Sequence, residues 1–211
     1  RLAPHRHMDT RECYIRRADR TEKMTMREIQ DLTLYTERGM ARIEALFQEK
    51  KDKFEERLIT FRKDAQHKIY GVRMTVIPTS EIHVNDVHNR TDVKANILTF
   101  KGVFNNSSAF DLYLPFSHGA WKPILRGTYS EGTETDYFLS VEILSNGLIE
   151  LIFLANENDN RNIIYPTWFM GLVCNTLYYL QRVRNATDTH NLEYALEVQI
   201  NNVCGVLEVD G

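Results

Sequence analysis

The stretch YFLSVEILSNGLIELIFLANE constrains the fold more strongly than any other part of the sequence. Two apolar runs rich in Val, Ile and Phe flank Asn146 and Gly147, and these residue types favour the pleated surface of a strand. Asn-Gly also supplies the two positive-φ positions that a two-residue hairpin turn requires. We therefore predict two antiparallel strands joined at residues 146–147.

The flanking segments add further strands and one helix to this hairpin. Residues 69–78 are typical of a strand that ends at Pro78, and the segments FDLYLPF, PILRGTYS and VCGVLEV are shorter strand candidates. Pro166 opens a predicted helix with one apolar face, formed by Phe169, Leu172, Val173, Thr176, Leu177, Leu180 and Val183. Apolar residues then alternate along a last strand, at Leu192, Tyr194, Leu196, Val198 and Ile200.

A long amphipathic helix is predicted before this module. Thr25 fits the N-cap position and Glu28 closes a capping box, and apolar or small residues then recur at helical spacing as far as Ala65, interrupted only at Lys50. About forty residues of helix would extend roughly 60 Å, which exceeds a small domain. We therefore expect the apolar stripe to pack partly on the module and partly on a second copy of the chain.

The seam of such a homodimer is predicted to be formed by Phe47, Phe54, Leu58 and Phe61. The alternative is a helix broken near Gly39 or Lys50 that folds back onto its own core. The predicted fold class is α+β, with a long N-terminal helix followed by a mainly antiparallel sheet with one covering helix. The predicted domains are residues 1–26, the helix 27–68 as a linker or coiled coil, and the α+β module 69–211.

Composition and charge limit the class of protein. With 43% hydrophobic and 26% charged residues, the chain is typical of a soluble globular protein, and a net charge of −3 opposes a uniformly basic, nucleic-acid-coating surface. Positive charge is regional, because the first 23 residues carry seven Lys and Arg against four acids. No apolar run approaches the roughly 20 residues that span a bilayer, so we expect a cytoplasmic protein without a membrane partner.

No residue pattern indicates catalysis, a metal or a cofactor. The three cysteines contain no CxxC pair, and the spacing of five between His83 and His88 would place the two imidazoles on different faces of a helix or strand. We expect Glu142 and Glu150, which flank the hairpin, to face solvent. Trp121 and Arg126 could recognise a ligand through a stacking surface and a forked donor, but we favour the alternative in which Trp121 covers the sheet edge and Arg126 pairs with an acid.

A family resemblance rests on the first 35 residues. The strand Tyr14-Ile15-Arg16-Arg17, followed by Thr21, Met24 and Ile29 at the helix start, resembles the closing part of the bacterial Schlafen-like, AlbA-type DNA-binding domain. The resemblance implies that residues 1–26 end such a domain, that most of it lies upstream, and that the protein contacts DNA. Within this segment Arg16, Arg17 and Arg20 are the expected phosphate contacts.

These observations predict a non-catalytic oligomerisation or sensor module of a bacterial DNA-binding protein, such as a transcriptional regulator. One alternative is the accessory half of a Schlafen-like nuclease or defence protein, whose acidic catalytic residues would lie upstream. The other alternative is a small-molecule enzyme with a site near Trp121 and Arg126.

Overall fold

The computed structural model describes residues 5–6, 12–17, 20–61, 68–96, 119–133, 136–157, 166–189 and 192–202. The chain divides into two compact units, Arg1–Ala45 and Leu46–Gly211. The elements in chain order are β1 (His5–Arg6), β2 (Cys13–Arg17), β3 (Arg20–Lys23), α1 (Met26–Phe61), β4 (Lys68–Pro78), β5 (Lys122–Ile124), β6 (Gly127–Thr133), β7 (Tyr137–Leu144), β8 (Ile149–Glu157), α2 (Pro166–Thr187) and β9 (Tyr194–Asn202).

The first unit contains a small antiparallel sheet in the order β1-β2-β3 and the first part of α1. Met24, between β3 and α1, is buried, and its N–H donates to the carbonyl of Cys13 at 2.8 Å. The predicted capping box is confirmed, since the Thr25 N–H donates to Glu28 at 2.8 Å and the Glu28 N–H donates to the Thr25 hydroxyl at 3.3 Å. These bonds satisfy two of the backbone donors that a helix start leaves free.

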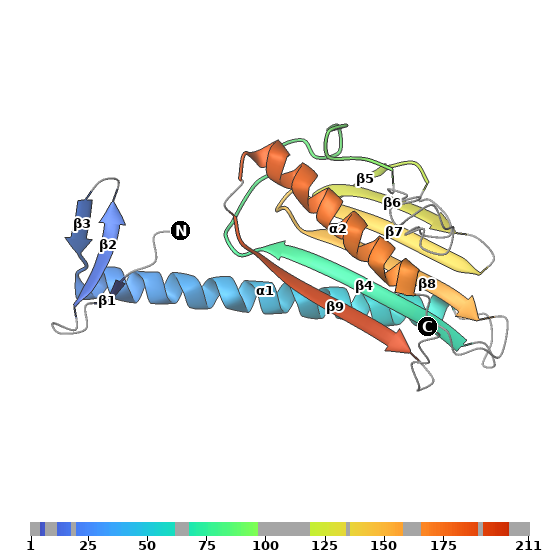
Figure 1. Ribbon diagram of the computed structural model, residues 1–211, viewed down its shortest axis with the longest axis horizontal. Helices are drawn as coiled ribbons and strands as arrows, with labels where there is room; N and C mark the ends of the chain where they lie inside the picture. The colour runs from blue at the N-terminus through green and yellow to red at the C-terminus, as the bar shows by residue number, and fades with distance from the viewer. Residues whose placement is uncertain are drawn as a thin grey trace, which may run out of the picture. The chain divides into compact units, whose positions relative to one another are not determined.

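The second unit is built on a six-stranded antiparallel sheet in the order β5-β6-β7-β8-β4-β9 (Figure 1). The strands predicted at residues 69–78 and 192–200 are confirmed as β4 and β9, and PILRGTYS lies in β5 and β6. Two strand candidates, residues 110–116 and 203–209, lie outside the described residues. Residues 79–96 form an irregular loop that is anchored by three buried valines, Val84, Val87 and Val93.

The β7–β8 hairpin forms, but the predicted two-residue turn is wrong. Of its loop residues only Gly147 has positive φ, at 79°, and the Leu144 N–H donates to the Leu148 carbonyl at 2.9 Å. The loop therefore has three residues, a turn at Ser145 and Asn146 followed by a left-handed glycine, which is the type that forms a glycine bulge. The extra residue sets the register, so that Ile143 lies opposite Ile149.

This register places apolar residues of the three central strands on one face, which α2 covers. Leu172, Tyr179 and Val183 of α2 belong to one buried cluster with residues of β4, β7 and β8. The strand residues of that cluster are Val72, Met74, Val76, Leu139, Val141, Ile143, Ile149, Leu151, Phe153 and Ala155. The helix predicted from Pro166 is thus confirmed as a covering helix, although Leu177 of its predicted apolar face is exposed.

The other face of the sheet is covered by the second part of α1, residues 46–61 (Figure 1). Phe54 and Leu58 are buried in a second cluster with Ile69, Phe138, Ile152 and Leu154. Gly71 of β4 permits this approach, because a Cβ there would lie 2.7 Å from Leu58 and 2.9 Å from Phe54. The helix has no break at Gly39 or Lys50.

The protein is mixed α and β, but the predicted arrangement of the fold is wrong. The long helix is not an N-terminal element followed by the sheet, since β1, β2 and β3 precede it and its second part packs on the large sheet. The sheet therefore has a helix on each face instead of one covering helix. The predicted domain boundaries at residues 26 and 68 stay a prediction. In the part of the chain that the structure describes, no helix has the length and apolar character needed to cross a membrane.

Candidate functional site

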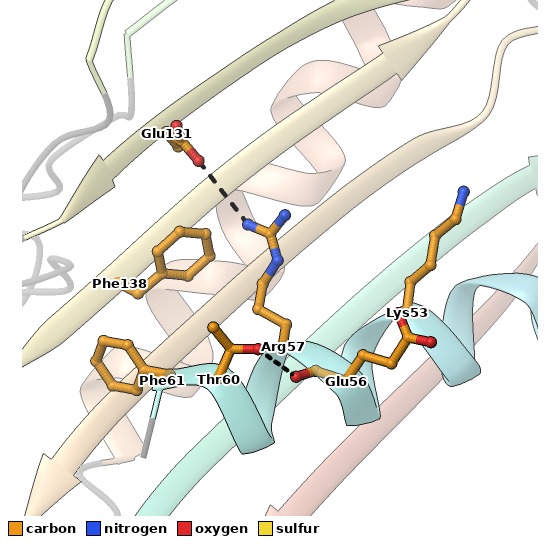
Figure 2. A pocket seen from close by; sticks show the side chains of 7 residues that line it. All are labelled: Lys53, Glu56, Arg57, Thr60, Phe61, Glu131 and Phe138. Atoms are coloured by element: carbon orange, nitrogen blue, oxygen red, sulfur yellow. Dashed lines mark hydrogen bonds and ion pairs between the residues drawn. The ribbon is translucent and has the colours of Figure 1, made fainter. Parts of the chain in front are cut away.

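A cavity of about 480 Å³ opens beside α1, where the helix flank faces β6 and β7. It is within the size range of small-molecule sites. Its lining residues, shown in Figure 2, are Lys53, Glu56, Arg57, Thr60, Phe61, Glu131 and Phe138. We call this site the Arg57 cavity. It combines two cations, two carboxylates and two aromatic rings.

Arg57 is held in place by contacts on several sides. Its guanidinium lies over the Phe138 ring, 4.7 Å from the centroid, and Nη1 donates to the Tyr129 hydroxyl at 2.7 Å. Figure 2 shows the side chain reaching from α1 toward Glu131, whose Oε2 lies 3.9 Å from Nη1. Neither Nε nor Nη2 makes a hydrogen bond to a described residue, so two donor nitrogens of a fixed fork have no partner in this part of the chain.

Tyr129 and Glu131 form the support behind this guanidinium. The Tyr129 hydroxyl donates to Glu131 at 2.7 Å, and Lys122 reaches the same carboxylate at 3.2 Å. Burial raises the pKa of Tyr129 to about 12, and its hydrogen bond to Glu131 adds to this increase. The hydrogen bond from Tyr129, followed by that from Lys122, lowers the pKa of Glu131. Glu131 is therefore an ionised, already neutralised acceptor at neutral pH.

A second polar site is buried between α1 and the sheet. Lys50 of α1 pairs with Glu142 of β7 and, at 3.2 Å, with Glu150 of β8. Arg73 of β4 is fully buried and donates to Thr75 at 2.7 Å and to Gln199 at 3.1 Å. It also pairs with Glu197 of β9 and lies 3.9 Å from Glu150. We call these seven residues the buried charged cluster.

Strand register explains why these charges meet. Glu142 lies directly opposite Glu150, Glu150 opposite Thr75, and Thr75 opposite Glu197, so they form one row across four strands. The expectation that Glu142 and Glu150 face solvent is wrong, because α1 lies over them and Lys50 contacts both carboxylates.

The pKa values reflect this burial. Burial alone would lower the pKa of Lys50, but Glu150 and Glu142 together hold it above its ordinary value. Burial raises the pKa of Glu150, Lys50 opposes this increase, and the Glu142 carboxylate adds to it. Every ionised member of the buried charged cluster has an opposite charge beside it, which is the pattern of a structural network.

The structure does not bring Trp121 and Arg126 together in one site. The Trp121 ring packs edge-on against Tyr179 of α2, with centroids 6.1 Å apart. Arg126 is exposed in the tight turn between β5 and β6, where its φ is 69° and its carbonyl accepts from the Ser145 N–H.

The predicted phosphate contacts lie on the small sheet. Arg17 of β2 is directly opposite Arg20 of β3, and Arg16 is opposite Thr21. Arg20 is exposed. His83 and His88 are also exposed, and no cluster of three metal-ligating side chains occurs among the described residues.

The predicted dimer seam is largely covered within one chain. Phe54 and Leu58 are buried against the sheet, Phe61 packs partly on Phe138 with ring centroids 6.2 Å apart, and Phe47 is partly exposed. Phe54 and Leu58 therefore need no second copy to be buried. Association through this helix stays a prediction.

Sequence reasoning missed both polar sites. Lys50 was visible as the one interruption of the apolar stripe, and a lysine at such a position signals an acidic partner. Arg57 carried no local signal, because its aromatic partners come from strands more than seventy positions away. No family model, no curated protein and no solved structure matches the chain.

Proposed function

We propose that the chain is a non-catalytic sensor module of a bacterial DNA-binding protein, and that its effector binds in the Arg57 cavity. The observation that carries this proposal is the fixed guanidinium of Arg57, which lies over an aromatic ring and keeps two donors available in a cavity of about 480 Å³. A preorganised cation beside apolar rings recognises an organic anion with a flat apolar body.

The charges at the cavity rim narrow the ligand class. Lys53 is the second cation, but Glu56 and Glu131 also line the site. The exposed carboxylate of Glu56 disfavours a multiply charged phosphate, whereas a ligand with one carboxylate can bind the guanidinium fork with less repulsion. The rings of Phe61 and Phe138 suit an aromatic body. We therefore propose an aromatic monocarboxylate as the effector class.

The DNA-binding part of the proposal rests on the resemblance of the first 35 residues and on the arginines of the small sheet. Two arginines stand in directly opposed register at Arg17 and Arg20. Like charges at opposed positions disfavour strand pairing, so a bound polyanion would favour this register. The buried charged cluster supports a non-catalytic module, because its charges stabilise each other.

Ligand titration tests the proposal. Phenylacetate should bind the chain with a Kd below about 1 mM, and the neutral amide phenylacetamide should bind at least about tenfold more weakly, because it lacks the charge that Arg57 recognises. Isothermal titration calorimetry gives both constants. In the variant Arg57→Met, which keeps an apolar chain over Phe138, phenylacetate affinity should fall at least about tenfold.

Lys51→Met is the matched control, since Lys51 is an exposed cation on the same helix and does not line the cavity. It should leave the phenylacetate Kd unchanged. Equal affinity for phenylacetate and phenylacetamide would contradict the proposal that the Arg57 cavity binds an anion. Equal phenylacetate affinity in the Arg57→Met variant and the native chain would contradict it as well.

A further inference from the structure

Strand β9 lies at one edge of the six-stranded sheet. No strand in the described ranges pairs with its outer side. On such an edge every second residue directs its N–H and C=O away from the sheet. Natural edges are usually protected by Lys, Pro, a bulge or short length. The nine residues of β9 include neither Lys, Arg nor Pro, and its one acid, Glu197, pairs with Arg73.

One face of β9 is also apolar and uncovered. Leu196, Val198 and Ile200 remain 59%, 41% and 52% exposed. Their register partners on β4 are Val76, Met74 and Val72, all of which are buried in the cluster beneath α2. The apolar face of β9 therefore continues the core face of the sheet past the area that α2 covers.

The flank of α2 extends this apolar area. Arg184 donates to the Leu192 carbonyl at 2.8 Å and lies over the Tyr194 ring, so this side of α2 faces the start of β9. Leu177 and Met170 precede Arg184 by about two and four helical turns, and this spacing places them on the same side of the helix. Both are exposed. We define the β9 surface as Met170, Leu177, Leu196, Val198 and Ile200.

We propose that the β9 surface binds a second copy of this chain, through antiparallel pairing of β9 with β9 centred on Val198. In this register Val198 faces Val198 of the other copy, Leu196 faces Ile200, and Glu197 faces Gln199. Three apolar pairs form on one face, and no like charges are opposed on the other. The same step pairs the outward-facing backbone groups of both β9 strands, which no described strand pairs in one copy.

Charge and apolar matching select this register over its neighbours. Centring on Glu197 would oppose two carboxylates at the two-fold axis, which disfavours pairing. Centring on Gln199 would place Leu196 opposite Asn202 and lose an apolar pair. The sequence of β9 is thus self-complementary in one register, which is the requirement of an isologous interface.

The symmetry also accounts for the apolar flank of α2. A two-fold axis perpendicular to the sheet keeps the α2 face of both copies on the same side. The two sheets then become one continuous antiparallel sheet, with β9 at its centre (Figure 1 shows β9 at the edge of one copy). Leu177 and Met170 of each copy border the joined strands. This inference does not depend on any ligand in the Arg57 cavity.

Sedimentation velocity on the full chain tests the proposal, with Val198→Glu as the variant. The native chain should be a dimer at about 100 μM, and Val198→Glu should raise the dimer Kd about a hundredfold or more, because it replaces the central apolar pair by two opposed carboxylates. The variant should stay folded, since the side chain is exposed in one copy. Leu125→Glu is the matched control, because Leu125 is 89% exposed in the β5–β6 turn at the other end of the sheet, and it should remain dimeric.

Disulfide trapping tests the register in a variant whose native cysteines are replaced by Ser. Val198→Cys should form a covalent dimer under mild oxidation, because opposed positions of an antiparallel pair have the spacing that a disulfide requires. Leu196→Cys should not, because it faces Ile200, whereas Leu196→Cys combined with Ile200→Cys should. Covalent dimers of Leu196→Cys alone would overturn the register.

Three further results would overturn the interface. The first is a native chain that is monomeric at about 100 μM while its circular dichroism shows a folded protein. The second is a Val198→Glu variant that dimerises as tightly as the native chain. The third is strong hydrogen-exchange protection of β9 amides in a monomer, which would show that another segment of the same chain covers the edge.

Discussion

At the residue scale, Lys50 joins α1 to the charged side chains of the sheet. The sequence presents it as a defect in an apolar stripe, and the structure buries it between two carboxylates. Part of this arrangement was predictable, because a hairpin that opposes Glu142 and Glu150 places like charges together and therefore needs a cation. The predicted two-residue turn would have paired Glu142 with Leu151. With that loop length the sequence does not predict that Glu142 and Glu150 are opposed. The partner of the carboxylates comes from about a hundred residues away, which local patterns cannot predict.

Lys50→Met should lower the free energy of unfolding by about 3 to 5 kcal/mol at neutral pH, because the buried Glu150 and the half-buried Glu142 would lose the cation between them. The pKa of Glu150 already lies above its ordinary value, so the carboxyl group of Glu150 binds its proton more tightly in the folded state than in the unfolded state. The stability that Glu150 contributes is therefore present below its ordinary pKa and is lost as the pH rises through its folded value.

Removing Lys50 removes the main influence that lowers the pKa of Glu150, so the variant should lose most stability at neutral pH and less below about pH 4.5. Urea unfolding at the two pH values measures this difference. Lys51→Met, which changes an exposed neighbour, should stay within about 0.5 kcal/mol of the native chain at both. If the loss of unfolding free energy in Lys50→Met were the same at both pH values, the carboxylates would not be its cause.

At the scale of elements, the type and order of the strands around β7 and β8 follow from the sequence, but their register does not. Strand register depends on one loop residue, since a slip by one residue turns every side chain to the opposite face. In the β7–β8 loop only Gly147 has a left-handed backbone conformation, and this residue also packs against the segment that contains Pro78 and Ile82. A Cβ at this position would be 2.3 Å from Ile82 and 2.9 Å from Pro78. Neither contact is visible in a local pattern.

Gly147→Val should lower the free energy of unfolding by at least about 2 kcal/mol, because a β-branched residue resists positive φ and the added carbons overlap Ile82. Asn146→Ala should lose only about 1 kcal/mol, the worth of the hydrogen bond from the Leu148 N–H to its side chain at 3.1 Å. Thermal unfolding of both variants gives the comparison. A larger loss of stability in Asn146→Ala than in Gly147→Val would contradict the three-residue loop. It would support the two-residue turn, which needs positive φ at both positions.

At the scale of the whole molecule, the amphipathic pattern identified α1 and predicted that its stripe packs partly on the module, but it assigned Phe54 and Leu58 to a dimer seam instead of to the sheet. A helical stripe of apolar residues has the same sequence signal whether it packs on a second helix or on its own sheet. The decisive features are on the sheet, where Gly71 leaves room for Phe54 and Leu58, and Ile152 and Leu154 form the surface beneath them. The division of the chain therefore falls within α1, at Ala45 and Leu46, so the sheet and its second helix belong to one unit.

Two shortened chains test this division. A chain of residues 46–211 contains both buried clusters and the buried charged cluster, so it should unfold cooperatively with a melting temperature close to that of the full chain. A chain of residues 69–211, which follows the boundary predicted from the sequence, lacks Phe54 and Leu58. It would expose Phe138, Ile152 and Leu154 to water and leave Glu142 and Glu150 without Lys50.

We therefore expect the 69–211 chain to lack a cooperative transition and the dispersed amide spectrum of a packed core, as measured by circular dichroism and proton NMR. Adding a peptide of residues 46–61 should restore the dispersed spectrum, whereas the same peptide with Phe54→Ala and Lys50→Met should not. A 69–211 chain that melts cooperatively at the native temperature without the peptide would show that α1 is dispensable for the sheet, and its stripe would then be available for the association with a second copy that the sequence predicts.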